Sequence, residues 1–174
     1  MATVTEVTVE EYLATSYDPD MEYVDGQLVE RNVGEYFHSR LQALIVALLM
    51  GRERERRFRT FSELRVEVGQ RRRYRIPDIC VKALPHQVTP VLLRPDLAIE
   101  ILSPDGKPGE TLERISDYLR SETADIWIVD PYGRRLFVAG PAGLRDIPEL
   151  VAETALVGSV DFNAVFRQLD EAAD

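Results

Sequence analysis

Residues 95–102 read PDLAIEIL, an apolar run typical of a buried strand, with Glu100 enclosed by apolar residues on both sides. An ionised carboxylate is costly to bury in such a strand unless a partner or a cation offsets its charge. Residues 76–79 read IPDI and place a second acid, Asp78, on another predicted strand. Two carboxylates that converge from neighbouring strands form a hard-oxygen site suited to Mg²⁺ or Mn²⁺.

The spacing of the acids indicates which aspartate accompanies Glu100. Asp96 precedes Glu100 by four residues on one strand, which at ~3.3 Å per residue separates them by roughly 13 Å, too far to share an ion. Asp78 belongs to a different strand, and two adjacent strands can bring their side chains together. We therefore expect Asp78 and Glu100 to form the pair, and Asp96 to bond to a turn at the start of its strand.

The elements around these strands alternate between the helical and the extended pattern. A Thr8–Glu11 capping box begins a short helix, and Asp25-Gly26 is a strong hairpin signal. Further elements are expected as strands at 21–24, 27–31, 57–61, 64–68, 74–81, 97–102, 126–130 and 134–139, and helices at 35–53, 109–121 and 161–170. This order predicts one α/β (mixed α+β) domain over residues 1–174, with a central mixed β-sheet flanked by helices and an N-terminal β-hairpin.

Composition narrows the class of protein. The 174 residues carry a formal net charge of −9, and 45% of them are hydrophobic, which is too apolar for a disordered chain. A single cysteine, Cys80, excludes a disulfide framework. The longest apolar stretch, residues 41–50, is far shorter than the roughly 20 residues that span a bilayer. We expect a cytoplasmic protein that does not insert into membranes.

A strongly basic segment interrupts this acidic chain. Residues 52–75 contain ten arginines and only four acids. Such an asymmetry can steer a phosphate backbone to one surface. The candidate DNA contacts are Arg56, Arg57, Arg59, Arg71, Arg72 and Arg73. The alternative, that these arginines only form a solvated surface, is equally open at this level.

Several motifs together resemble a known family. They are Pro77-Asp78, the segment PDLAIEILSP (95–104), WIVDP (127–131), EYVDG (22–26), Tyr118 and His38. Over about residues 20–140 the chain resembles the Uma-type restriction endonuclease family, which is similar to the PD-(D/E)XK nuclease superfamily. The resemblance implies a restriction-endonuclease-like core and divalent-metal-dependent hydrolysis of DNA phosphodiester bonds.

The resemblance also assigns roles to single residues. Asp78 and Glu100 take the two metal-binding acid positions, with the Ile101 backbone carbonyl as a further ligand to Mg²⁺ or Mn²⁺. The superfamily often has a lysine two residues after the glutamate, where this chain has Leu102. Relatives instead supply a lysine from the following helix, and the matching residue here is Arg114.

Arg114 changes the chemistry that this position can perform. A guanidinium stays protonated and cannot act as a general base, but it can stabilise negative charge on phosphate oxygens. Lys82 and Lys107 are alternative sources of a cation. His38 and Glu30 are candidate supporting groups, His38 as a group that orients or relays a proton.

Two other functions remain open from the sequence. The missing lysine and the acidic net charge are compatible with a catalytically inactive nuclease fold that binds nucleic acid or a protein partner. A metal-dependent hydrolase with a substrate other than nucleic acid is the third possibility. An enzyme that cuts both DNA strands would work as a homodimer, but no residue pattern identifies an interface.

Overall fold

The computed structural model describes residues 7–31, 34–69 and 73–171 of the chain. The largest sheet in this described part has six strands, of which β8 and β9 run parallel while the other neighbours are antiparallel. In spatial order the strands are β11 (Gly143–Asp146), β10 (Arg135–Gly140), β9 (Asp125–Asp130), β8 (Leu97–Ile101), β6 (Ile79–Ala83) and β3 (Phe58–Ser62). The predicted mixed central sheet is confirmed.

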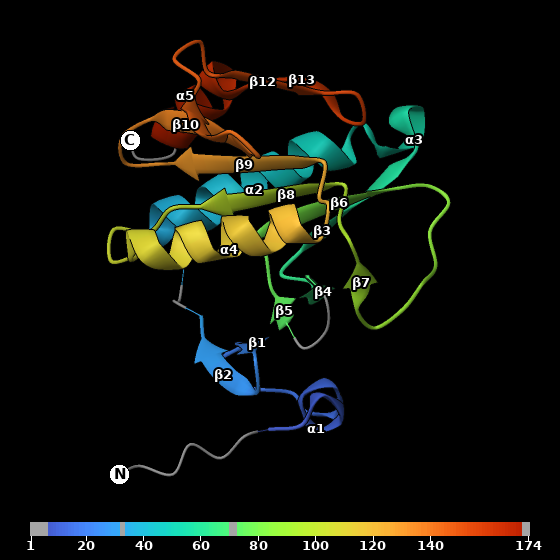
Figure 1. Ribbon diagram of the computed structural model, residues 1–174. Helices are drawn as coiled ribbons and strands as arrows, with labels where there is room; N and C mark the ends of the chain where they lie inside the picture. The colour runs from blue at the N-terminus through green and yellow to red at the C-terminus, as the bar shows by residue number, and fades with distance from the viewer. Residues whose placement is uncertain (1–6, 32–33, 70–72, 172–174) are drawn as a thin grey trace.

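Helices cover both faces of this sheet (Figure 1). Alternate residues of a strand point to opposite faces, so Ile79 and Ile99 pack in the cluster that contains helices α2 (Tyr36–Met50) and α5 (Phe162–Glu171). Cys80 and Ala98 pack on the other side, with helix α4 (Pro108–Arg120). None of the helices in the described ranges has the length and apolar character needed to cross a membrane.

A second sheet carries the N-terminal hairpin and lies below the first in Figure 1. Its order is β2 (Gln27–Glu30), β1 (Met21–Val24), β5 (Arg73–Arg75), β4 (Val66–Glu67) and β7 (Leu92–Leu93). The predicted Asp-Gly turn is confirmed, because Asp25 and Gly26 both have positive φ, 50° and 93°, as a type I′ turn requires. The Thr8–Glu11 capping box is also present, at the start of α1 (Val9–Ala14).

The structure corrects two predicted elements. The single strand expected over residues 74–81 is divided into β5 and β6, which belong to different sheets. Pro77 has no N–H for a ladder hydrogen bond, so the chain leaves one sheet before it and joins the other after it. The helix expected over 35–53 ends at Met50, and after Gly51 a separate short helix follows, α3 (Glu53–Arg56).

Four strands of the described part were not predicted. One is the short β7, and the other three lie near the C-terminus. Strands β12 (Val151–Thr154) and β13 (Gly158–Asp161) form a two-stranded sheet before α5. Strand β11 adds an edge to the central sheet, and all four of its residues are exposed. Short or exposed strands carry little apolar periodicity, which is the signal that sequence patterns offer.

Candidate active site

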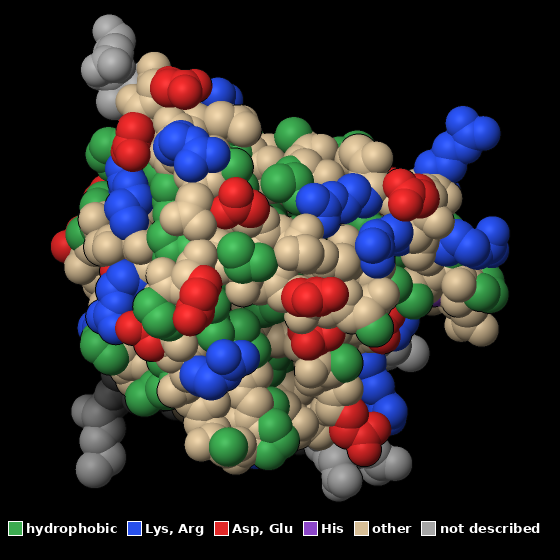
Figure 2. All heavy atoms as spheres, turned by 90° about the horizontal axis from the view of Figure 1, so that it is seen from above, with side chains coloured by type: hydrophobic (Ala, Val, Ile, Leu, Met, Phe, Trp, Pro, Cys, Tyr) green, Lys and Arg blue, Asp and Glu red, His purple; other side chains and the backbone are tan. Residues whose placement is uncertain are grey.

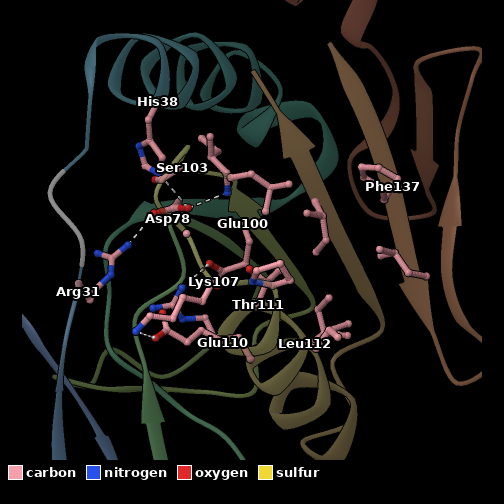
Figure 3. A pocket seen from close by; sticks show the side chains of 18 residues that line it. Arg31, His38, Asp78, Glu100, Ser103, Lys107, Glu110, Thr111, Leu112 and Phe137 are labelled. Atoms are coloured by element: carbon pink, nitrogen blue, oxygen red, sulfur yellow. Dashed lines mark hydrogen bonds and ion pairs between the residues drawn. The ribbon is translucent and has the colours of Figure 1, made fainter. Parts of the chain in front are cut away.

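A cavity of about 380 Å³ lies between the first half of α4 and the central sheet. Asp78, Glu100, His38, Arg31 and Arg114 line one part of it. Figure 3 shows Asp78 and Glu100 side by side in this pocket, with His38 above them on α2 and Arg31 approaching from the other side. The two acids singled out from the sequence therefore face one cavity.

Strand register explains why these acids meet. Ile79 is paired with Ile99 in the antiparallel ladder between β6 and β8. Extending this register by one residue sets Asp78 opposite Glu100, and residues directly opposite share a face of the sheet with Cβ atoms about 5 Å apart. The Asp78 Oδ2 atom accepts a 2.7 Å hydrogen bond from the backbone N–H of Ile101. The carboxylate of Asp78 is thus bonded to the residue that follows Glu100.

The Asp78 carboxylate is buried and held ionised by its neighbours. Arg31 donates to Oδ1 at 2.6 Å, and His38 Nε2 lies 3.4 Å from Oδ2. Burial opposes the charge, but His38, Arg31 and the Ile101 amide together hold the pKa of Asp78 below its usual value. Gln42, one helical turn after His38, donates to the Asp78 carbonyl at 2.9 Å. Helix α2 therefore holds Asp78 through two side chains.

The environment of His38 favours its protonated form. Burial disfavours the imidazolium, yet the hydrogen bond and the charge of Asp78 raise the pKa of His38 above its ordinary value. A histidine protonated beside an aspartate donates a charge-assisted hydrogen bond. His38 is consequently suited to fix Asp78 in place.

Glu100 is buried beside Asp78 and has two partners of its own on α4. The Tyr118 hydroxyl donates to its Oε1 at 2.5 Å, and Arg114 Nη1 lies 3.8 Å from its Oε2. Burial, together with the charge of Asp78, raises the pKa of Glu100 to about 7, although Arg114 and Tyr118 oppose this shift. A second negative charge is therefore unfavourable beside Asp78, and a bound cation would relieve that cost.

A buried ionic network next to the cavity was not predicted. Glu22 on β1 is fully buried and accepts hydrogen bonds from Arg75 at 2.8 Å and from the Ile76 N–H at 3.0 Å. Its carboxylate also lies 3.3 Å from Arg114 Nε. Asp117 on α4, equally buried, accepts from Arg75 at 2.8 Å. The network joins the N-terminal hairpin to the helix that lines the cavity.

The sequence spacing of some of these residues indicates that they share a face of a helix or a strand. Arg114, Asp117 and Tyr118 are three and four residues apart on one helix, so they share a face. Arg73 and Arg75 are two residues apart and share a face of a strand. Nothing in the sequence, however, indicates that Glu22 and Arg31 approach Arg114 and Asp78, because those contacts depend on how the two sheets are placed.

The remaining candidates are distributed as follows. Ile101 and Lys107 line the cavity, and Lys107, just before α4, is ion-paired with Glu110 at 3.1 Å. Glu30 is exposed at the end of β2 and does not line the cavity. Lys82 is bonded to Asp96 at 3.1 Å and to the Arg94 carbonyl at 2.7 Å, outside the cavity.

The predicted DNA-contacting arginines do not gather around the acids. Arg57 comes just before β3. The first residue of β3, Phe58, pairs with Ala83 of β6, which lies five residues after Asp78 in the sequence. Figure 2 shows several Lys and Arg side chains at the end where Figure 1 places α3, while opposite charges mix over most of that face. Arg59 lies 3.6 Å from Glu53. Arg56, Arg57 and Arg59 therefore lie toward the far end of β3.

Arg73 lies on the second sheet and forms ion pairs with Asp25, Glu113 and Asp117. Its charge is therefore already balanced by three carboxylates. Arg71 and Arg72 lie outside the described residues.

The donor set consists of carboxylate oxygens, which suit hard divalent cations such as Mg²⁺ and Mn²⁺ better than softer metals. Within residues 7–31, 34–69 and 73–171, no three or more His, Cys, Asp or Glu side chains form a group that could hold a metal ion. Mg²⁺ is commonly bound through one or two carboxylates, with water completing its shell. The adjacent carboxylates of Asp78 and Glu100 meet that requirement, and the raised pKa of Glu100 indicates a site that favours added positive charge.

Comparisons with known proteins indicate similarity to nucleases. The Uma2 family model, whose description is "Putative restriction endonuclease", matches residues 9–159. A solved structure described as a "putative nuclease belonging to DUF820" from Anabaena variabilis ATCC 29413 superimposes with a TM-score of 0.80. It is 26% identical, and the match covers 94% of this chain and 99% of that one. No curated protein matches the chain.

Proposed function

The chain belongs to the Uma2 restriction endonuclease family, and from this premise we propose that it is a divalent-metal-dependent nuclease that hydrolyses DNA phosphodiester bonds. One observation carries the proposal. Asp78 accepts the amide hydrogen bond of Ile101 and so stands beside Glu100 in a cavity that is open to a ligand. Paired buried acids are the feature that a metal-dependent hydrolase needs and that an ordinary sheet avoids.

Asp78 and Glu100, with the Ile101 carbonyl, would hold Mg²⁺ or Mn²⁺. When bound, such an ion polarises the scissile phosphate and lowers the pKa of a water molecule. His38 and Arg31 orient Asp78 through their contacts with its two carboxylate oxygens. In this proposal His38 acts as a positioning residue, since its raised pKa favours the protonated form.

Cationic groups of the same cavity suit a phosphate. The Arg114 guanidinium reaches the cavity beside Glu100 and stabilises negative charge that builds up on phosphate oxygens. Lys107 adds a second cation at the start of α4. Arg114, on α4, and Lys107, just before this helix, thus bring two side-chain cations to the cavity.

The test uses conservative variants of each acid. Asp78→Asn and Glu100→Gln should abolish Mg²⁺- or Mn²⁺-dependent cleavage of plasmid and oligonucleotide DNA, and Mn²⁺ binding in titration calorimetry. Asp96→Asn is the matched control. Asp96 lies just before β8, the strand that carries Glu100, but it is bonded to Lys82 outside the cavity. Cleavage that persists in both site variants would refute the assignment.

Two observations favour a second candidate, a nuclease fold that binds nucleic acid without cutting it. Arg31 and His38 already pair with Asp78, and Arg114 stands where the family resemblance implies a lysine. This alternative predicts no cleavage and no Mn²⁺ binding by the wild-type protein, with DNA binding retained.

A further inference from the structure

The cavity has an apolar end that the proposed chemistry does not use. Ile128 on β9, Phe137 on β10 and Leu144 on β11 line it from the sheet, and Leu112 lines it from α4. In Figure 3, Phe137 and Leu112 lie on the side of the pocket away from His38 and Asp78. Leu112 and Leu144 are 57% and 47% exposed, although both are large apolar residues.

The two ends of the cavity divide by chemistry. Arg31, Arg114 and Lys107 line the same cavity as the acids, whereas the opposite end offers a phenyl ring and aliphatic side chains. The guanidinium of Arg135 lies 4.6 Å from the centre of the Phe137 ring, so a cation also borders the apolar end. Its charge is shared with Asp146, 2.9 Å away.

We propose that the apolar end binds a nucleobase of the DNA strand, unpaired and turned out of its stack, while the phosphate of the same or the adjoining nucleotide faces Asp78 and Glu100. The proposal rests on the function proposed above and names the form of the substrate. A nucleotide joins a flat apolar base to an anionic phosphate, which is the division that the cavity shows. Its volume falls within the roughly 300–1,000 Å³ range of pockets that hold small ligands.

The base must leave the duplex to reach this surface. Both faces of a base are covered by its neighbours in a stack, and enzymes that bind a base in a pocket extrude it or act on single strands. Aromatic side chains stack on any of the four bases, because every base has a π-face. The apolar end therefore favours single-stranded or locally opened DNA and imposes little sequence preference.

The test separates base binding from phosphate binding and from cleavage. Fluorescence anisotropy in EDTA measures the affinity for single-stranded dT12, for an abasic 12-unit oligomer with the same phosphates, and for a 12-base-pair duplex. The wild-type protein should bind dT12 about 5- to 150-fold more tightly than the abasic oligomer, the range that one base–aromatic contact supplies. The duplex should bind more weakly than dT12, since a base must first unpair.

Variants locate the effect. Phe137→Ala should bring the dT12-to-abasic ratio close to one and leave the affinity for the abasic oligomer unchanged. Leu144→Asn does the same at an exposed position where folding is not at risk, and Val88→Asn is its matched control, an exposed apolar residue outside the cavity. Equal binding of dT12 and the abasic oligomer by the wild-type protein overturns the proposal, as does an equal loss on both probes in Phe137→Ala.

Two further outcomes are distinguishable. If Leu144→Asn converts a dimer to a monomer in sedimentation and the dT12-to-abasic ratio stays the same, a second copy of the chain covers the apolar end and the proposal fails. If the wild-type protein discriminates dT12 from the abasic oligomer but cuts no DNA with any divalent metal, base binding stands while the catalytic function fails.

Discussion

Glu22, on the N-terminal hairpin, holds the guanidinium of Arg114, on the helix that lines the cavity, with 3.3 Å between Oε1 and Nε. The same carboxylate accepts hydrogen bonds from Arg75 and from the Ile76 N–H. Because Arg114 also faces Glu100, the hairpin sets the position of a cation in the candidate active site. A segment far from the acids in sequence is thus part of the site's electrostatics.

Replacing Glu22 should cost much of the protein's stability. Glu22→Gln keeps the shape but removes the buried carboxylate that Arg75 and Arg114 share, and breaking a buried pair costs about 3–5 kcal/mol. Urea denaturation measures the loss in the free energy of unfolding. The control is Glu113→Gln, which removes the half-exposed partner of Arg73 and Arg75 and should cost less than about 1 kcal/mol. Equal losses in the two variants would contradict the role given to Glu22.

Arg114 stands where the family resemblance implies a lysine, and its charge should matter for cleavage. Arg114→Met should lower the single-turnover cleavage rate by about 10²- to 10³-fold, the loss typical of removing a group that stabilises transition-state charge. Arg114→Lys restores a cation and should retain most of the rate. Comparing the cleavage rate with the DNA affinity separates stabilisation of the transition state from binding of the substrate. An Arg114→Met enzyme as fast as wild type would remove Arg114 from the mechanism.

Glu100 should make the metal-free protein less stable as pH rises. Its pKa is raised in the folded protein from the ordinary 4.5 of a glutamate to about 7, so the folded state binds the proton more tightly. The stabilisation that protonated Glu100 provides is complete below about pH 4.5 and is lost as pH rises through 7. The loss in the free energy of unfolding is about 3 kcal/mol, since each unit of pKa difference corresponds to about 1.36 kcal/mol.

Urea denaturation in EDTA at several pH values measures this difference between the wild type and Glu100→Gln. The advantage of wild type over the variant should shrink with rising pH. Parallel pH profiles for the two proteins would show that Glu100 titrates normally.

Salt dependence should show which cations contact phosphate. The logarithm of DNA affinity falls with the logarithm of salt concentration, and each lost phosphate contact lowers the slope by about 1. Lys107→Gln, at the start of α4, should lower the slope by about 1. The double variant Arg57→Gln/Arg59→Gln should lower it by about 2 on a long duplex if the DNA continues toward α3. An unchanged slope in the double variant would limit the path to the cavity.

Local patterns predicted the elements with strong periodicity or turn chemistry. The Asp25-Gly26 turn and the buried strand around Glu100 each depend on neighbouring residues, which a sequence displays directly. The acid pair Asp78–Glu100 followed from the cost of burying charge. The division of residues 74–81 was missed, although Pro77 was its signal. Arg31 and Glu22 were missed because their partners lie far away in the chain, and only the packing of the sheets brings them together.

The bond from the Ile101 amide to Asp78 has a consequence for how the family can vary. It ties one acid to the main chain beside the other, so their separation depends on backbone geometry that side-chain replacements elsewhere leave intact. The pair therefore keeps its place whichever residues line the apolar end, and a substitution there alters the ligand that fits while the acids stay where they are.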